Sequence, residues 1–406
     1  MSAARIHHAL GLHLHQPPGN LRLLIEANPW AAEEILRCYE RIPRYALRYR
    51  DVARLHVGFS GVLLEQLTDP DIVDRYRRIL DIPAMLNAYR EADNIELVGM
   101  GYYHPLFPLI PRADWAEQLE RGRAMTERVL GRAPRGFWPP EMAFTMEMIP
   151  ALVQAGYEYV VVDGVHVRPA DGLSDIFRPY AVCHGGVCIR VVPRDRAVSN
   201  AQESGLDPDW FRREVEARVA ASPRPDEGRL VTTWSDGENG GWFRQTHEAS
   251  GFFGHFLAPC LERRRAGDWP IEPVCLTDYL ALARPMAAAQ VQTGAWNVGS
   301  TSGADLSQWA GSARQREAVA EVQRLSERYW RLWQARPEPP DPQVQAALAE
   351  ARRLILEAET SCFLFWGDAW IPHLYARTGP AVSALDRVES VLGPGRAAAP
   401  GTGDEG

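Results

Sequence analysis

The chain contains no uninterrupted apolar segment of about 18 residues, the length needed to cross a bilayer. Its first residues lack the charged start and apolar run of a secretory signal peptide. Basic residues are outnumbered by acidic ones, with 44 Lys and Arg and 52 Asp and Glu, which gives a net charge of −8. Phosphate binding requires a basic surface, so this balance argues against nucleic acid as a partner. We expect a cytoplasmic protein that binds neither nucleic acid nor membrane; the sequence leaves its oligomeric state open.

Cysteine is sparse, with six in 406 residues, and the six are dispersed rather than set in a dense framework. We therefore expect all of them to be free thiols. Cys183 and Cys188 lie close together, but the intervening Gly185-Gly186 favours a β-hairpin turn over a zinc site. No metal and no cofactor is expected.

Short β-rich runs alternate with helical patterns over the first two-thirds of the chain. Several runs, such as Tyr159-Val160-Val161-Val162, are continuously apolar, which is typical of strands buried on both faces of a parallel sheet. The expected strands are 6–15, 53–60, 95–100, 136–139, 157–163, a pair within 180–192, and 230–235. The expected helices between them are 31–48, 70–92, 112–130 and 146–155.

This alternation predicts an α/β fold, an incomplete TIM-like (β/α)7 barrel, over residues 1–269. Strand signals cease at about residue 270. Beyond it, apolar residues at helical spacing (Ala318, Val322, Leu325, Tyr329, Leu332) and a second stripe (Val344, Leu348, Ala351, Ile355) predict a C-terminal α-helical domain over 270–392. Asp341-Pro342 is typical of a helix N-cap followed by proline at the first helical position. The tail 393–406, rich in Gly, Pro and Ala, is expected to be disordered.

Titratable residues gather where the expected strands end. In a barrel, catalytic residues occupy the C-terminal ends of strands and the loops that follow. The first strand ends in His13-Leu14-His15, and the period of two places both histidines on one side of it. Later strands lead to His104, to Glu141 after Trp138-Pro139-Pro140, and to Asp236-Gly237-Glu238 after Trp234. Two acids facing one cleft beside tryptophans are what cleavage of a glycosidic bond requires.

Each of these elements also has a purely structural interpretation. The two histidines can be satisfied by neighbouring strands, and Asp236-Gly237 is a common turn sequence. Glu141 can begin a helix, where a carboxylate favours the helix dipole. The conjunction of the elements, in order, is far more specific than any one of them.

Four ordered motifs give the chain a resemblance to glycoside hydrolase family 57. His13-Leu14-His15-Gln16-Pro17-Pro18 matches the opening motif of that family, and the run from Glu96 through Gly101 to His104-Pro105 resembles the second. Phe137 to Glu141 resembles the third motif and Ser235 to Asn239 the fourth. The resemblance covers residues 6–245 by motif and extends more loosely to 358–362 and 366–368.

The resemblance implies a retaining enzyme for α-linked glucans, with Glu141 as nucleophile and Asp236 as general acid/base. Retention needs the two carboxyl groups about 5–5.5 Å apart. Asp236 must then hold a proton, through the nearby charge of Glu141 or through partial desolvation by Trp234 and Trp242.

The same resemblance implies a set of substrate-binding residues. The three histidines are expected to bind sugar hydroxyls, Glu238 to orient one of these groups, and tryptophans to form walls and stacking faces. The full set is His13, His15, His104, Trp138, Trp234, Glu238, Trp242, Trp296, Trp309 and Trp366.

The sequence therefore predicts a retaining α-glycosidase or α-glucanotransferase whose partner is an α-glucan such as glycogen, starch or maltodextrin. Three alternatives stay open. One is an α-galactosidase of the same family. Another is a metal-dependent carbohydrate deacetylase-like enzyme that uses His13, His15, His104 and Asp236 as ligands. The last is a catalytically inactive glucan-binding homologue.

Overall fold

A computed structural model describes residues 5–202, 206–224, 229–238, 247–282, 286–296, 305–339 and 341–393. Seven parallel strands run in the spatial order β9-β1-β2-β3-β4-β5-β8. Their bounds are β1 Ile6–Leu14, β2 Leu55–Phe59, β3 Ile95–Gly99, β4 Gly136–Phe137, β5 Tyr159–Asp163, β8 Val187–Arg194 and β9 Arg229–Asp236. The last strand thus lies beside the first, as in a barrel.

The barrel is open between β8 and β9. In the described ranges no strand ladder joins these two strands, which meet through a bond from the Asp195 N–H to the Thr232 carbonyl at 2.8 Å. The α/β fold with an incomplete seven-stranded barrel, expected from the sequence, is confirmed.

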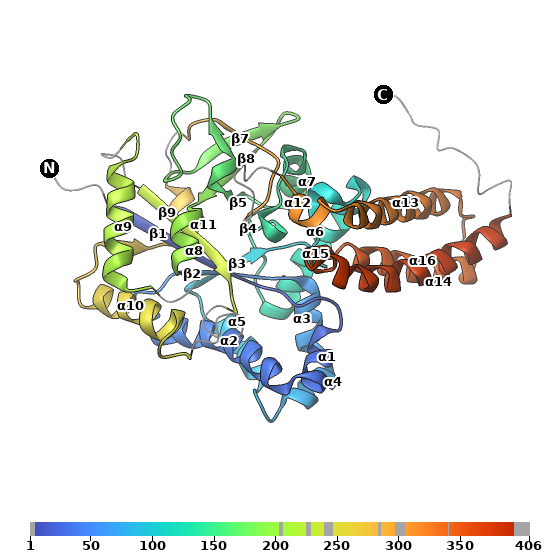
Figure 1. The fold of residues 1–406 in the computed structure, drawn as a ribbon, viewed down its shortest axis with the longest axis horizontal. Coiled ribbons are helices and arrows are strands. Elements are labelled where there is room, and N and C mark those ends of the chain that lie inside the picture. Colours follow the sequence, from blue (N-terminus) through green and yellow to red (C-terminus); the bar gives the residue numbers. More distant parts are fainter. Residues whose placement is uncertain are drawn as a thin grey trace.

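Helices surround the sheet, as Figure 1 shows. Their bounds are α1 Asn20–Ala27, α2 Pro29–Arg48, α3 Gly61–Thr68, α4 Pro70–Tyr76, α5 Ile82–Glu91, α6 Arg112–Leu130, α7 Ile149–Gln154, α8 Arg196–Gln202, α9 Pro208–Ala220, α10 Ala258–Arg265 and α11 Leu276–Ala281. The helix expected over 70–92 is instead two helices, α4 and α5. The break occurs because Asp81 caps a new helix by accepting a bond from the Ala84 N–H, and Pro83 occupies its first turn.

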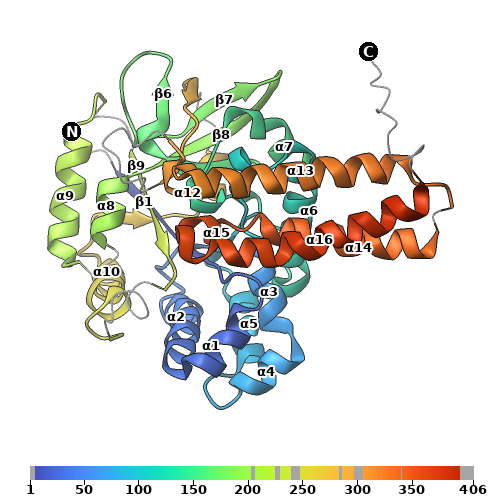
Figure 2. The same cartoon turned by 45° about the vertical axis from the view of Figure 1, so that its right-hand side comes forward.

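A C-terminal helical region follows, with α12 Ser307–Ala310, α13 Ala313–Ala335, α14 Pro342–Ala358, α15 Ser361–Phe365 and α16 Ile371–Leu392. Figures 1 and 2 both show α13, α14 and α16 extending together away from the sheet. The apolar stripes expected on the first two are buried, and Asp341 caps α14 by accepting a bond from the Gln343 N–H. The division at residue 269 stays a prediction, and the tail 394–406 lies outside the described residues.

Two short strands beyond residue 270 contradict the expectation that strands cease there. β10, Ile271–Pro273, pairs in parallel with the start of β1. β11, Ala289–Val291, pairs with β6, Val167–Pro169, in a separate two-stranded sheet. Segments of three residues are too short to display the alternation by which strands are recognised. In the part of the chain that the structure describes, no helix is long and apolar enough to cross a membrane.

The expectation of six free thiols is wrong for one pair. β7, Tyr180–His184, and β8 form the predicted hairpin around Gly185-Gly186, and this pairing sets Cys183 directly opposite Cys188. Directly opposed residues in an antiparallel pair are close enough for disulfide formation, and these two are bonded. The other four cysteines are not disulfide-bonded. The hairpin was visible in the sequence, but its exact register was not.

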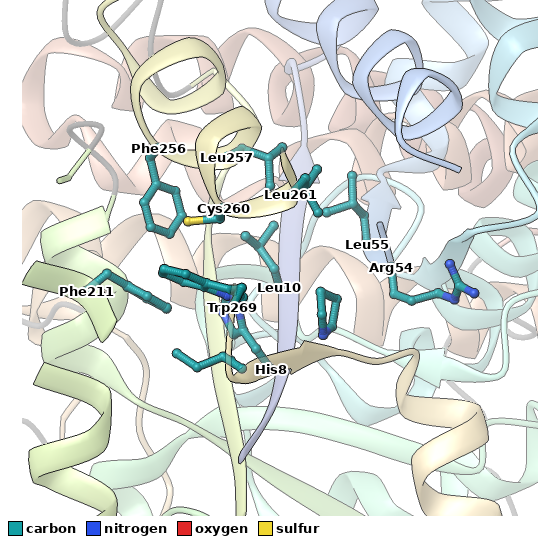
Figure 3. Close-up of a pocket in the computed structure, with 12 residues that line it drawn as sticks. His8, Leu10, Arg54, Leu55, Phe211, Phe256, Leu257, Cys260, Leu261 and Trp269 are labelled. Atoms are coloured by element: carbon teal, nitrogen blue, oxygen red, sulfur yellow. The ribbon is translucent and has the colours of Figure 1, made fainter. Parts of the chain in front are cut away.

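The alternation along β1 separates the barrel interior from its outer layer. Even-numbered residues face the helices, and His8 and Leu10 line a small cavity beneath α10 together with Phe256 and Trp269 (Figure 3). That cavity measures about 30 Å³ and is mostly apolar, so it is a packing gap with room for no sugar. Odd-numbered residues face the interior and lead to the rim.

Candidate active site

One pocket of about 380 Å³ at the C-terminal rim of the barrel collects most of the residues expected from the sequence. The members of the expected set that line it are His13, His15, His104, Glu141, Asp236, Glu238, Trp296 and Trp366. Residues from α1, α2 and the C-terminal helical region complete the wall, so the pocket lies between the barrel and the helices that follow it.

Strand register brings Asp236 to His13. The two residues are partners in the ladder of β1 and β9, and both side chains rise from the interior face. Nε2 of His13 lies 3.1 Å from Oδ1 of Asp236, whose side chain is 37% exposed. Water therefore reaches this carboxylate.

The expected desolvation of Asp236 by Trp234 is not what the structure shows. Trp234 is fully buried one step deeper in the barrel, where its indole fills the space left by Gly11. Trp242 lies outside the described residues. A proton on Asp236 stays a prediction, and the charges of Asp236 and Glu141 influence each other.

Glu141 is held by two hydrogen-bond donors. It follows Pro139-Pro140 in a 3₁₀ turn, Pro140–Met142, with a left-handed φ of 58° that is costly for a residue other than glycine. Nε1 of Trp296 donates to Oε2 at 2.9 Å, and the hydroxyl of Ser361 donates to Oε1 at 3.0 Å. Burial, joined by the charge of Asp236, raises the pKa of Glu141 to about 7 although both bonds lower it. The carboxyl group is thus poised between its two protonation states near neutral pH.

Glu238 is the third acid of the pocket and is buried. Its Oε1 accepts bonds from the Tyr39 hydroxyl at 2.5 Å and from Nε2 of Gln16 at 3.3 Å. Burial and then the charge of Asp236 raise the pKa of Glu238 to about 8, against the lowering effect of these donors. A protonated Glu238 at neutral pH leaves fewer like charges around Asp236.

The three histidines form a stacked group. His15 lies parallel to His104 with ring centroids 4.0 Å apart, and His13 stacks on Trp138 at the same separation. Burial lowers the pKa of His13 to about 3, and burial followed by neighbouring imidazoles lowers the pKa values of His15 and His104 well below the usual value. All three rings are therefore neutral at pH 7, which suits them to bind hydroxyl groups.

His15 and His104 each also keep a nitrogen for a ligand, whereas Nε2 of His13 faces Asp236. Nδ1 of His15 bonds to the Ser60 hydroxyl and Nδ1 of His104 to the Ser361 hydroxyl, both at 2.8 Å. Nδ1 of His13, Nε2 of His15 and Nε2 of His104 are buried without a hydrogen-bond partner among the described residues. Buried polar atoms rarely lack a hydrogen-bond partner in a protein core. Here they belong to side chains that line a pocket, where a ligand can supply the partner.

The expected tryptophans fall into two groups. Trp296 and Trp366 line the pocket, and Trp138 supports its floor beneath His13. Trp309 is fully buried against Phe365, and Trp234 fills the barrel interior, so neither contacts the pocket space. Both belong to the core, where their indoles fill the interior volume.

Sequence reasoning assigned no role to several pocket residues. Tyr39 comes from α2, and Ser361, Cys362 and Trp370 come from the C-terminal helical region. Ser361 and Cys362 fall within the loosely matching segment 358–362, which was the only signal for them. Burial raises the pKa of the Cys362 thiol, so this side chain is neutral.

Comparison with known proteins matches residues 9–266 to the model of glycosyl hydrolase family 57. An α-amylase of Pyrococcus horikoshii is 28% identical over 80% of this chain and 47% of its own. A 4-α-glucanotransferase of Thermococcus litoralis is 33% identical over 47% of this chain and 27% of its own. The chain spans about half the length of this α-amylase and a smaller share of the length of the other matched relatives.

Solved structures share the fold at low identity. The branching enzyme of the 57 type from Pyrococcus horikoshii superposes with a TM-score of 0.67 at 18% identity, over 96% of this chain and 88% of the other. A branching enzyme from Thermococcus kodakaraensis gives a TM-score of 0.69 at 17% identity, over 99% and 96%. Together with the family match over most of the chain, these likenesses show that the chain belongs to glycosyl hydrolase family 57.

Proposed function

We propose that the chain is a retaining glycoside hydrolase or transglycosylase that acts on α-glucans through a covalent glycosyl-enzyme. The observation that carries the proposal is the presence of Glu141 and Asp236 in one pocket, where Glu141 is only 12% exposed and held by two donors and Asp236 is 37% exposed. The relatives named α-amylase and 4-α-glucanotransferase support glycogen, starch or maltodextrin as the substrate class.

In the first step, the ionised Glu141 attacks the anomeric carbon while Asp236 gives a proton to the departing glycosidic oxygen. The bonds from Trp296 and Ser361 hold the attacking carboxylate in place, so little reorganisation is needed during attack. In the second step, Asp236 takes a proton from water or from a sugar hydroxyl, which then attacks the ester and frees Glu141.

The neutral histidines suit the non-reacting part of the substrate. Their unpartnered nitrogens accept or donate hydrogen bonds according to tautomer, as sugar hydroxyls require. Trp296 forms one wall of the pocket, and Trp366, 51% exposed, offers a flat apolar face at its opening. We assign sugar binding to His13, His15, His104, Trp296 and Trp366. Glu238 is assigned the role of orienting one of these side chains.

We also propose a cytoplasmic location. There, reducing conditions disfavour structural disulfides, so the pair Cys183–Cys188 offers a direct check. If the location is cytoplasmic, the bond seen in the structure is expected to be reduced there, and mass spectrometry after rapid alkylation of intact cells then detects two thiols. A quantitative disulfide in freshly opened cells contradicts this location.

Product analysis tests the proposed function. Purified protein is incubated with amylose, with maltooligosaccharides and with an α-galactoside, and the products are resolved by size and linkage. Shorter α-glucans indicate hydrolysis, and redistributed chain lengths indicate transfer. The variant Glu141→Gln, which keeps the shape but cannot form the ester, is expected to lose activity by a factor of about 10³ or more.

The outcomes separate the alternatives. Turnover of the α-galactoside alone identifies an α-galactosidase, and acetate release that requires a divalent metal identifies a deacetylase. Binding of maltooligosaccharides without turnover of any α-glycoside identifies a non-catalytic homologue. Near-normal activity of Glu141→Gln on a genuine substrate contradicts the mechanism.

A further inference from the structure

Ser361 lies in the C-terminal helical region, yet its backbone is fixed to the barrel. Thr360 forms a β-bridge with Pro105 in the segment that follows β3. The Ser361 N–H donates to the carbonyl of His104 at 3.1 Å. His104 itself has a left-handed φ of 59°, a conformation that such neighbouring bonds must stabilise. The start of α15 is therefore attached beside the pocket floor.

The hydroxyl of Ser361 stands between two of the pocket residues. It lies 2.8 Å from Nδ1 of His104 and 3.0 Å from Oε1 of Glu141, and the residue is fully buried. A hydroxyl has one hydrogen to donate, and an ionised carboxylate can only accept. The Ser361 O–H therefore donates to Glu141, and its oxygen accepts the N–H of His104.

This direction of hydrogen bonding fixes the tautomer of His104. A neutral imidazole with its hydrogen on Nδ1 has a bare lone pair on Nε2. That Nε2 atom is the one left buried and without a partner in the described ranges, in a ring that lines the pocket. His104 thus presents an acceptor to the pocket, which fits a sugar hydroxyl that donates.

We propose that Ser361 is a positioning residue through which the C-terminal helical region controls the active site of the barrel. Its hydroxyl orients the carboxylate of Glu141 and sets His104 as a hydrogen-bond acceptor toward the substrate. The kinetic consequence of this inference rests on the proposed function. The chain of hydrogen bonds from His104 through Ser361 to Glu141, the hydrogen-bond relay, is a property of the protein without substrate.

The relay has a defined electrostatic setting. The titratable groups that face Glu141 are His104 after β3, Asp236 and Glu238 at the end of β9, and Cys362 on α15. The imidazoles and the thiol are neutral near pH 7, so the donors on Trp296 and Ser361 are what favours the ionised carboxylate. Loss of the Ser361 donor raises the pKa of Glu141 further, because burial then acts with less opposition.

Kinetics of Ser361→Ala test the role in catalysis. We expect kcat/KM on a maltooligosaccharide to fall about 10- to 100-fold, the usual effect of losing a hydrogen bond to a charged group. We also expect the acidic limb of its pH profile to move to higher pH by about one unit or less. The control is Ser383→Ala on α16, which removes an exposed hydroxyl from the same helical region and is expected to change neither quantity.

A second measurement needs no enzymatic activity. Nitrogen-15 spectra of histidine-labelled protein, with the His104 signals identified by their loss in His104→Gln, report which ring nitrogen carries the hydrogen. We expect the Nδ1–H tautomer in the native protein between pH 8 and 9, where Glu141 is ionised, and a mixed or Nε2–H state in Ser361→Ala.

The two measurements separate failure of this inference from failure of the proposed function. An Nε2–H tautomer of His104 in the native protein overturns the relay, whatever the enzyme does. An Nδ1–H tautomer with an unchanged pH profile in a folded, active Ser361→Ala overturns the role in catalysis. If no α-glycoside is turned over, the proposed function fails, and the tautomer still decides whether the relay exists.

Discussion

Glu141 and Asp236 differ in how water reaches them, and we propose that this difference sets the role of each in the reaction. Glu141 lies beneath the pocket opening with each oxygen held by a donor, as a nucleophile must be aimed. Asp236 stands at the end of β9 with a 37% exposed side chain, where an incoming water or sugar hydroxyl can be deprotonated. The separation of the two carboxyl groups, about 5–5.5 Å for retention, stays a prediction.

Replacement of Asp236 separates proton donation from nucleophilic attack. Asp236→Asn is expected to reduce turnover of maltooligosaccharides by a factor of about 10² to 10⁴, because their leaving groups need protonation. Formation of the glycosyl-enzyme from an aryl glycoside with an acidic leaving group is expected to be affected far less. The burst of released phenol measures that step.

The control for this variant is Asp81→Asn, which makes the same chemical change at an N-cap where asparagine works equally well. It is expected to behave like the native protein. Equal losses of Asp236→Asn on both kinds of substrate argue against an acid role.

At the scale of elements, the strand β1 determines which side chains reach the pocket. Its interior residues run from Ala9 and Gly11 to His13 and His15 at the rim. Gly11 lies opposite Trp234 in the ladder with β9, and a Cβ at this position overlaps the indole. The glycine thus lets one tryptophan fill the barrel below the histidines.

Gly11→Ala is therefore expected to destabilise the protein by about 1–3 kcal/mol, the usual cost of overpacking a core. Urea unfolding followed by tryptophan fluorescence measures the change in free energy of unfolding. Gly379→Ala on α16, where an added Cβ meets nothing within 4 Å apart from its chain neighbours, is the control, and it is expected to cost less than Gly11→Ala because no packed side chain has to move. Equal effects of the two substitutions contradict this account of the interior.

At the scale of the whole molecule, a buried polar network joins the barrel helix α6 to the C-terminal helices. Nη1 of Arg352 bonds to Asp114, and its Nε donates to Glu117 at 2.7 Å. The Ser326 hydroxyl and Nε1 of Trp330 donate to the same aspartate at 2.6 and 2.9 Å. This network holds the helical region against the barrel, and thereby α15 against the pocket.

Arg352→Met removes the cation and leaves Asp114 buried. We expect a loss of about 3–5 kcal/mol in the free energy of unfolding, as for other buried pairs that lose one partner. The double variant with Asp114→Asn is expected to lose less than the sum of the single variants, because the two residues interact. Strict additivity in urea unfolding contradicts a direct energetic coupling.

The sequence predicted the barrel and most of the rim for a physical reason. Parallel strands buried on both faces are continuously apolar, and their ends meet at one edge, so residues such as His13, Glu141 and Asp236 must come together. The same pattern cannot distinguish a tryptophan that fills the barrel, such as Trp234, from one that lines the pocket, such as Trp296. Their neighbours in the sequence do not distinguish them, and only three-dimensional packing separates them.

Contacts that depend on exact backbone pairing were the other part that the sequence did not reveal. Ser361 reaches Glu141 only because Thr360 pairs with Pro105 across the boundary between barrel and helices. The disulfide Cys183–Cys188 depends on the exact register of a hairpin, which a turn sequence suggests but does not determine. Both features follow from pairing rather than from composition.

The central claim is that Glu141 forms a covalent bond to the sugar. The most direct measurement is to incubate the protein with a 5-fluoro-α-glucosyl fluoride, whose glycosyl-enzyme forms faster than it hydrolyses, and to analyse intact protein and its peptides by mass spectrometry. We predict the addition of one fluoroglucosyl group, carried by the peptide that contains Glu141, and no addition to Glu141→Gln. An adduct on another residue, or turnover with inversion of the anomeric configuration and no adduct, would contradict the account.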